Sequence, residues 1–209
     1  TPAVQAWLAR QLEGLPEDPV TRIRALYLAV RDGIRYNPYV FHTDPATFKA
    51  SHALAQGETY CIPKAVLLGA AARAIGIPSR LGLADVRNHL SSPKLIEWPR
   101  SDIFRMHGYI ELYLNGRWVK APPAFNADLC HKMKVAPLAF DGVHDSLFQE
   151  YTEDGQAHME YIADHGTFDD LPYAFIVSGV RAAYGHLFPP EGESRQPASA
   201  SLEQDLAQR

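Results

Sequence analysis

One cysteine and one histidine in this chain have sequence surroundings that suit nucleophilic catalysis. Cys61 opens an apolar segment, and Pro63 fits the first turn of a helix, where the N–H that proline lacks would be unpaired anyway. The unpaired amides and the dipole of a helix N-terminus favour an anion, so they favour thiolate over thiol. The segment therefore predicts a nucleophilic cysteine, with a buried structural thiol as the alternative.

His107 begins a segment whose alternating side chains predict the first strand of a β-hairpin. An Asn-Gly pair at residues 115–116 separates two such runs, and this pair favours a two-residue turn because both central positions need positive φ. The turn fixes the register and places Tyr113 opposite Trp118, a favourable aromatic cross-strand pair. In this register His107 projects from the same face as Tyr109.

A buried helix should carry Cys61 at its start. Residues 64–75 are mostly Ala, Leu, Val and Ile, so we expect this helix to be buried on most sides. Gly76 can take the left-handed conformation that ends a helix, and Pro78 prevents its continuation. A strand over residues 80–86 then leaves the helix.

Together these segments resemble the transglutaminase-like superfamily of papain-type cysteine enzymes. That family combines a Cys at the start of a buried helix, which ends in Gly-Ile-Pro-Ala-Arg, with a later His-Ala-Trp-x-Glu-Val strand. Here Gly-Ile-Pro-Ser-Arg at residues 76–80 and His-Gly-Tyr-Ile-Glu-Leu at residues 107–112 follow Cys61 in the same order. The resemblance covers residues 50–126. It implies an α+β fold in which Cys61, at the N-terminus of a buried helix, packs on an antiparallel sheet that carries His107.

The family's third motif is a strand that begins near a Trp and ends in Asp-Pro, and here the sequence departs from it. Counted from the tryptophan, the Asp position falls at about Pro122, and proline cannot orient an imidazole. Asn126 is the first side chain on the predicted His107 face that can accept a hydrogen bond from the ring, a role that Asn fills in papain-like enzymes. Asp128 and Asp141 are the alternatives, and an Asx-turn after two prolines is the structural reading of Asn126.

The resemblance implies that a Cys61 thiolate attacks a carbonyl carbon, with His107 as general base or as the imidazolium of an ion pair. The Cys61 N–H is the natural oxyanion donor, and Gln56, Tyr60 or His52 could supply a second one. The product is a thioester. Water would resolve it in a peptidase or amidase, and a lysine amine would resolve it in a protein-glutamine transamidase. We favour hydrolysis, because nothing in the sequence identifies an amine-acceptor site.

The resemblance, together with adjacency in the chain, implies that three parts line the cleft: residues 36–48, which are rich in aromatic side chains, the connection over residues 86–103, and Tyr109. The expected substrate is a peptide or protein. A catalytically inactive transglutaminase-like module that binds peptides or protein partners is the alternative from another functional class, because the Asp-Pro motif is missing.

Composition agrees with a soluble enzyme. The 209 residues suit one domain of ordinary size, with 46% hydrophobic and 21% charged residues. A net charge of −4 gives no reason to expect nucleic acid or an anionic membrane as a partner, and no run of 18 apolar residues occurs. We expect a hydrolase domain over residues 1–188 and a flexible tail, rich in Pro, Glu and Ser, over residues 189–209.

Two cysteines are present, Cys61 and Cys130. A disulfide between them would disable the predicted nucleophile, so we expect both to be reduced and the compartment to be cytoplasmic. The histidines and cysteines lack the paired spacing of a zinc site, and no glycine-rich phosphate loop occurs. The sequence therefore predicts neither a metal nor a cofactor.

Overall fold

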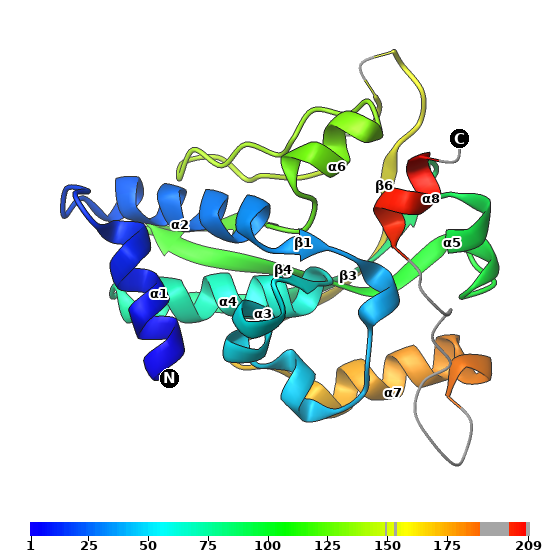
Figure 1. Ribbon diagram of the computed structural model, residues 1–209, viewed down its shortest axis with the longest axis horizontal. Helices are drawn as coiled ribbons and strands as arrows, with labels where there is room; N and C mark the ends of the chain where they lie inside the picture. The colour runs from blue at the N-terminus through cyan, green and yellow to red at the C-terminus, as the bar shows by residue number, and fades with distance from the viewer. Residues whose placement is uncertain (149, 153, 189–200, 208–209) are drawn as a thin grey trace.

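The computed structural model describes residues 1–148, 150–152, 154–188 and 201–207, and its centre is a four-stranded antiparallel sheet (Figure 1). The strand order is β5-β4-β3-β6, with β3 (Ser79–Asn88), β4 (Ile103–Leu114), β5 (Arg117–Ala121) and β6 (Met159–Phe168). Two short strands, β1 (Arg35–Tyr36) and β2 (Glu58–Thr59), form a parallel pair. The α-helices are α1 (Pro2–Leu12), α2 (Pro19–Gly33), α3 (Ala50–Gln56), α4 (Cys61–Ala74), α5 (Pro93–Glu97), α6 (Ala127–Lys132), α7 (Tyr173–Ala183) and α8 (Leu202–Ala207). The 3-10 helices are η1 (Pro38–Val40), η2 (Pro45–Phe48) and η3 (Gly185–Leu187).

Helix α4 packs against β3 and β4, and a glycine permits its close approach. A Cβ on Gly108 of β4 would lie 2.9 Å from the Cα of Ile62, the second residue of α4. Glycine at this position therefore brings the start of α4, with Cys61, directly against the strand that carries His107. This arrangement is the α+β fold that the resemblance to the transglutaminase-like superfamily implies.

The predicted limits of the cysteine helix are confirmed. α4 starts at Cys61, and beyond its end Gly76 takes φ = 81°, where two backbone hydrogen bonds close a Schellman motif. One turn into the helix, Lys64 is fully buried. Its side-chain nitrogen donates to the carbonyls of Arg31 (2.8 Å) and Ile34 (2.5 Å), which ties the first turn of α4 to the end of α2.

The hairpin has the predicted register. Tyr113 pairs with Trp118, with ring centroids 5.3 Å apart, and both Asn115 and Gly116 have positive φ. β5 ends opposite Ile110. On the side of β4 that faces β5, the residues before Ile110 have no partner strand among the described residues.

Two parts of the sheet differ from the sequence-based expectation. The edge strand β6, which pairs with β3, was not predicted, because only Met159 among its residues is buried and it mixes polar residues such as Glu160 and Asp164 into both faces. The connection expected over residues 86–103 is also shorter than predicted. β3 continues to Asn88, and α5 occupies the middle of the remaining segment.

Part of the expected tail is a packed helix. Residues 189–200 and 208–209 lie outside the described residues, whereas α8, drawn in red, lies near α6 (Figure 1). The buried carboxylate of Asp205 accepts hydrogen bonds from the Tyr39 hydroxyl (2.5 Å) and from Lys94 Nζ (3.0 Å). α8 is therefore held against the domain, which differs from the loose attachment expected for this segment. The boundary at residue 188 stays a prediction.

The described residues also bear on membranes, metals and disulfides. Among them, no helix is both long enough and apolar enough to cross a bilayer, and no group of three His, Cys, Asp or Glu side chains is placed to hold a metal ion. Cys61 and Cys130 are both free and buried.

Candidate active site

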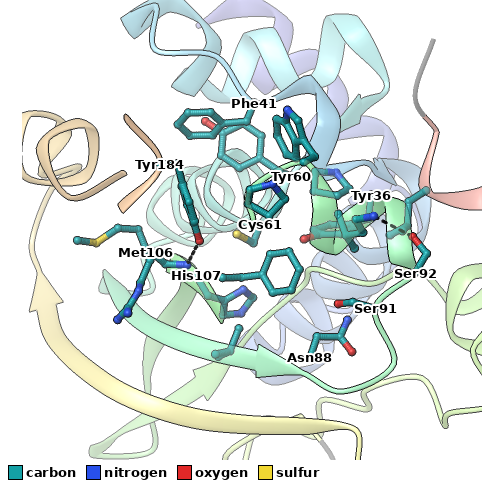
Figure 2. Close-up of a pocket in the computed structure, with 18 of the residues that line it drawn as sticks. Tyr36, Phe41, Tyr60, Cys61, Asn88, Ser91, Ser92, Met106, His107 and Tyr184 are labelled. Carbon is teal, nitrogen blue, oxygen red and sulfur yellow. Dashed lines mark hydrogen bonds between the residues drawn. The ribbon is translucent and has the colours of Figure 1, made fainter. Parts of the chain in front are cut away.

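Cys61 is the first residue of α4, and its side chain lies against β4 where β5 no longer covers that strand. Its Sγ accepts a hydrogen bond from the Gly108 N–H, with a sulfur–nitrogen distance of 3.4 Å. Gly108 directly follows His107, and the side chains of Cys61 and His107 line the same cavity (Figure 2). The structure thus brings together the two residues that the sequence selected, although no hydrogen bond joins these two described side chains.

The imidazole of His107 is buried, with 5% of its surface exposed, and it rests against the Phe148 ring at a centroid distance of 5.0 Å. Within the described part of the chain, its Nε2 has no hydrogen-bond partner. Burial lowers the pKa of His107 to about 4, so the ring is neutral at pH 7. A neutral imidazole with an unpaired nitrogen can accept a proton, which is what a general base requires.

The thiol of Cys61 is less acidic than its place at a helix start predicts. Burial raises the pKa of Cys61 to about 11. The N–H groups of Gly108, Ile62 and Cys61 itself lower this pKa, as does the charge of Lys64, but together they do not offset burial. The expected thiolate is therefore not the resting form, and near neutral pH both Cys61 and His107 are neutral.

A β-bulge directs His107 toward the cavity. Met106, the residue before it, has φ = 58°, which is uncommon for a non-glycine residue, and the register between β3 and β4 shifts at this point. The carboxylate of Asp85, 2% exposed, accepts hydrogen bonds from the Met106 N–H (3.0 Å) and from the side chains of Arg105 (2.7 Å) and His165 (2.9 Å). Asp85 thus fixes the backbone that presents His107. Asp85 is not among the residues predicted from the sequence, because a bulge of this kind leaves no local sequence signal.

Of the three candidates for a third catalytic residue, Asp128 is exposed in the first turn of α6, and Asn126 and Asp141 have other partners. Asn126 is buried at the start of α6, and its Oδ1 accepts a hydrogen bond from the Tyr36 N–H (3.2 Å). Asp141 is exposed, and its carboxylate bonds to the His144 ring (2.7 Å) and to two backbone N–H groups. Neither of these described side chains is hydrogen-bonded to His107, so the identity of the third residue stays a prediction.

The other predicted site residues, Gln56, Tyr60 and Tyr109, lie in three different places. Gln56 is exposed at the end of α3, and Tyr109 is buried beside a second hollow. Only Tyr60 lines the cavity together with Cys61. The Gly108 N–H, which donates to Sγ, is a backbone donor that was not predicted from the sequence.

The cavity around Cys61 has about 1030 Å³ of empty space, counting the part open to solvent. Both predicted segments, 36–48 and 86–103, contribute to its walls, together with α7, η3 and α8. Most of the lining is apolar, and its aromatic members are Tyr36, Phe41, Tyr60, Trp98, Phe104, Phe125, Tyr184 and Phe188. Arg105 has the only Lys, Arg, Asp or Glu side chain among the described lining residues, and its guanidinium is paired with the Asp85 carboxylate. Such walls favour an uncharged, largely apolar group.

One comparison of the sequence with known protein families gives a match, and two solved structures are similar to this chain. A sequence model of the transglutaminase-like superfamily matches residues 6–123, more than half of the chain. A Cytophaga hutchinsonii protein provisionally assigned as a cysteine protease is 14% identical, with a TM-score of 0.48 over 83% of this chain and 44% of its own. This chain therefore spans less than half of that protein's length. Arylamine N-acetyltransferase from Salmonella typhimurium is 17% identical, with a TM-score of 0.47 over 88% of this chain and 70% of its own. Among curated proteins, none matches the sequence significantly. The chain belongs to the transglutaminase-like superfamily.

Proposed function

We propose that the protein is a cysteine-dependent hydrolase or acyl transferase, with Cys61 as nucleophile and His107 as general base, that acts on a peptide or amide bond. One observation carries the proposal. Cys61 Sγ lies at the first residue of a buried helix and accepts the N–H of Gly108, the neighbour of His107, and both side chains line one cavity. The match to the superfamily supports an enzyme of this general class.

The neutral resting state of the pair suggests the order of proton transfers. Cys61 loses its thiol proton to the His107 imidazole as Sγ forms a bond to the carbonyl carbon. The resulting oxyanion can be stabilised by the N–H groups of Cys61 and Gly108, each worth about 3 kcal/mol of barrier. The carbon–nitrogen bond then breaks, and the imidazolium gives its proton to the leaving amine.

The thioester that remains needs a second nucleophile. Water attacks the thioester carbon while His107 takes one of its protons, and the carbon–sulfur bond breaks to release a carboxylic acid and the thiol. An amine in place of water would give transamidation. We keep hydrolysis as the proposal, with a peptide or protein as substrate. We keep a cytoplasmic location as well, because the nucleophile must remain a free thiol.

Asn126 remains the proposed third member of a Cys61–His107–Asn126 triad. Its buried position and its neutral oxygen suit a residue that orients an imidazole. The carboxylate of Asp141 is exposed and already accepts three hydrogen bonds, which makes it the weaker candidate.

The test compares the two buried cysteines of the chain. Peptidyl and simple acyl anilides are assayed with the unchanged protein and with the Cys61→Ala, His107→Ala and Cys130→Ala variants. We expect the first two variants to lose at least about a thousandfold in kcat/KM, and Cys130→Ala to keep its activity. An acyl adduct on Cys61, seen by intact mass after acid quench, would identify the thioester. Full activity in Cys61→Ala would overturn the proposal.

A peptide-binding module without catalysis is the second candidate. Two observations favour it: burial raises the pKa of Cys61 to about 11, and no described residue is hydrogen-bonded to His107 Nε2. This candidate predicts that peptides bind to the unchanged protein and to Cys61→Ala with equal affinity, that no anilide is cleaved, and that no adduct forms on Cys61.

A further inference from the structure

The cavity that holds Cys61 contains buried polar atoms that lack partners. Among the described residues, His107, Tyr60 and Ser91 line this cavity, and the buried His107 Nε2, Tyr60 hydroxyl and Ser91 hydroxyl make no hydrogen bond. Tyr60 is 4% exposed and Ser91 is 8% exposed. A buried hydroxyl without a hydrogen bond is costly in free energy, and such groups are few in folded proteins. Two of them on the wall of one cavity therefore point to a bound molecule that pairs with them.

The two hydroxyl side chains belong to different parts of the wall. Ser91 lies beside Asn88 and Ser92, in the segment between β3 and α5, and Figure 2 shows these three residues together on one side of the cavity. Tyr60 is the neighbour of Cys61 in the chain, and its ring contacts Phe41 at a centroid distance of 5.0 Å. Most of the residues that line the cavity with Cys61 and Ser91 are apolar or aromatic, so a molecule that fills it contacts such side chains.

The same walls are unsuited to charge. The guanidinium of Arg105 donates through Nη1 to the buried carboxylate of Asp85, so its positive charge already has a counter-ion. A carboxylate or ammonium inside the cavity would lose its hydration without gaining a counter-ion. An aromatic ring, in contrast, can pack against the aromatic lining edge to face, as Tyr36 and Phe125 do at a centroid distance of 4.8 Å.

We propose that Ser91 and Tyr60 form a specificity subsite that selects an uncharged aromatic acyl group carrying a hydroxyl. The inference rests on the proposed function, because the acyl carbonyl must lie at Cys61. The ring fills the apolar part of the cavity, and its hydroxyl pairs with the Ser91 hydroxyl at the far end. The Tyr60 hydroxyl, nearer the nucleophile along the chain, pairs with the amide of the substrate. Ser91 therefore distinguishes between acyl groups, whereas Tyr60 assists all of them.

The test uses a matched pair of substrates, the anilides of para-hydroxyphenylacetic acid and phenylacetic acid, together with para-carboxyphenylacetyl and acetylglutaminyl anilides as polar counterparts. The variants are Ser91→Ala and Tyr60→Phe, each of which removes one hydroxyl. Ser146→Ala is the control, because its buried hydroxyl lines the second hollow. Values of kcat/KM are measured for each combination. Binding of the same compounds to Cys61→Ala is followed by calorimetry.

We expect the unchanged protein to prefer the hydroxylated anilide by about tenfold, and Ser91→Ala to abolish this preference. Tyr60→Phe should lower kcat/KM for both anilides by a similar factor, and Ser146→Ala should change kcat/KM for neither. Equal kcat/KM for the matched pair, a preference for the carboxylated or glutaminyl anilide, or a preference that survives Ser91→Ala would overturn the inference and leave the proposed function standing. Ser91-dependent binding to Cys61→Ala, without any turnover by the unchanged protein, would uphold the subsite and overturn the proposed function.

Discussion

The two free cysteines share their acidity and differ in their surroundings. Burial raises the pKa of both Cys61 and Cys130 to about 11. Cys130 lies inside the short helix α6, where Arg31 lowers its pKa and Asp32 raises it. Cys61 begins its helix and lines a cavity, and its Sγ accepts a hydrogen bond from the Gly108 N–H. Access and partners, rather than the pKa of the free thiol, therefore separate the candidate nucleophile from an ordinary buried cysteine.

The largest effect should come from a side chain that fills the close contact between α4 and β4. A Cβ at position 108 would meet the Ile62 backbone at 2.9 Å, so Gly108→Val must push the start of α4 away from the strand. We expect a loss of about 2 kcal/mol in the free energy of unfolding and of at least about a hundredfold in kcat/KM. Denaturant unfolding, anilide assays and mass-resolved alkylation of the two cysteines measure these changes.

The alkylation rates also test the comparison. Gly108→Val should change the rate at Cys61 and leave the rate at Cys130 as it was. Gly33→Ala, where a Cβ has no neighbour within 4 Å, serves as the control and should alter neither thiol. Equal changes in the alkylation rates of both cysteines would mean that the substitution loosens the whole protein. They would contradict the distinction drawn between Cys61 and Cys130.

The pH dependence should distinguish a neutral pair from an ion pair. With its pKa near 11, Cys61 should react with iodoacetamide about tenfold faster for each pH unit of increase below that value, and Cys130 should follow the same slope at a lower rate. Turnover needs an unprotonated His107, so kcat/KM should fall as the pH falls through about 4. A plateau of Cys61 alkylation from about pH 5 to about pH 8 that is lost in His107→Ala would instead indicate a thiolate–imidazolium pair.

A smaller effect is expected from Asp85→Asn, which weakens the support of the bulge before His107. Burial raises the pKa of Asp85, but hydrogen bonds from His165, Arg105 and the Met106 N–H lower it by more. Its folded-state pKa thus lies below the unfolded value of about 3.9, so the carboxylate stabilises the protein above that pH, and this contribution is lost as the pH falls through the folded-state pKa. Asp85→Asn should cost about 2 kcal/mol at pH 7 and flatten the acid limb of the stability curve.

Activity provides the readout that separates positioning from stability alone. We expect Asp85→Asn to lower kcat about tenfold with little change in KM, because His107 is misdirected while the cavity is retained. Alkylation of Cys130 should be unaffected. The control, Asp102→Asn, removes an exposed partner of Arg87 (3.0 Å) and should change stability by less than about 1 kcal/mol. A kcat that is unchanged in Asp85→Asn would contradict the positioning role.

The parts of the fold that were predictable carry local signals. Gly76 and Pro78 mark the end of α4, and the Asn-Gly turn fixes which residues of β4 and β5 face each other. β6 gave no such signal, because an edge strand with a single buried residue needs no alternation of apolar and polar residues. The packing of α8 depends on Asp205 reaching Tyr39 and Lys94, which are far from it in the sequence.

The candidate site also combines features that the sequence predicts with features that depend on tertiary packing. Cys61 and His107 could be selected because each stands at the start of a recognisable element, and the structure places them on one cavity. The pKa of Cys61 could not be anticipated, because it depends on burial by distant segments rather than on the helix start alone. The left-handed backbone of Met106 and the unpaired hydroxyl of Ser91 likewise arise from tertiary packing.

The end of β5 has a consequence for the sulfur. The antiparallel register pairs Ile110 with Ala121, so a longer β5 would bring residue 123 opposite Gly108. That residue is Pro123, and the strand has already stopped before it. The interruption leaves the Gly108 amide without a carbonyl acceptor from a neighbouring strand, and Cys61 Sγ occupies the vacated place. The unfinished edge of the sheet thus leaves room for the thiol, and Pro122 and Pro123, outside the two motifs that carry Cys61 and His107, create this opening.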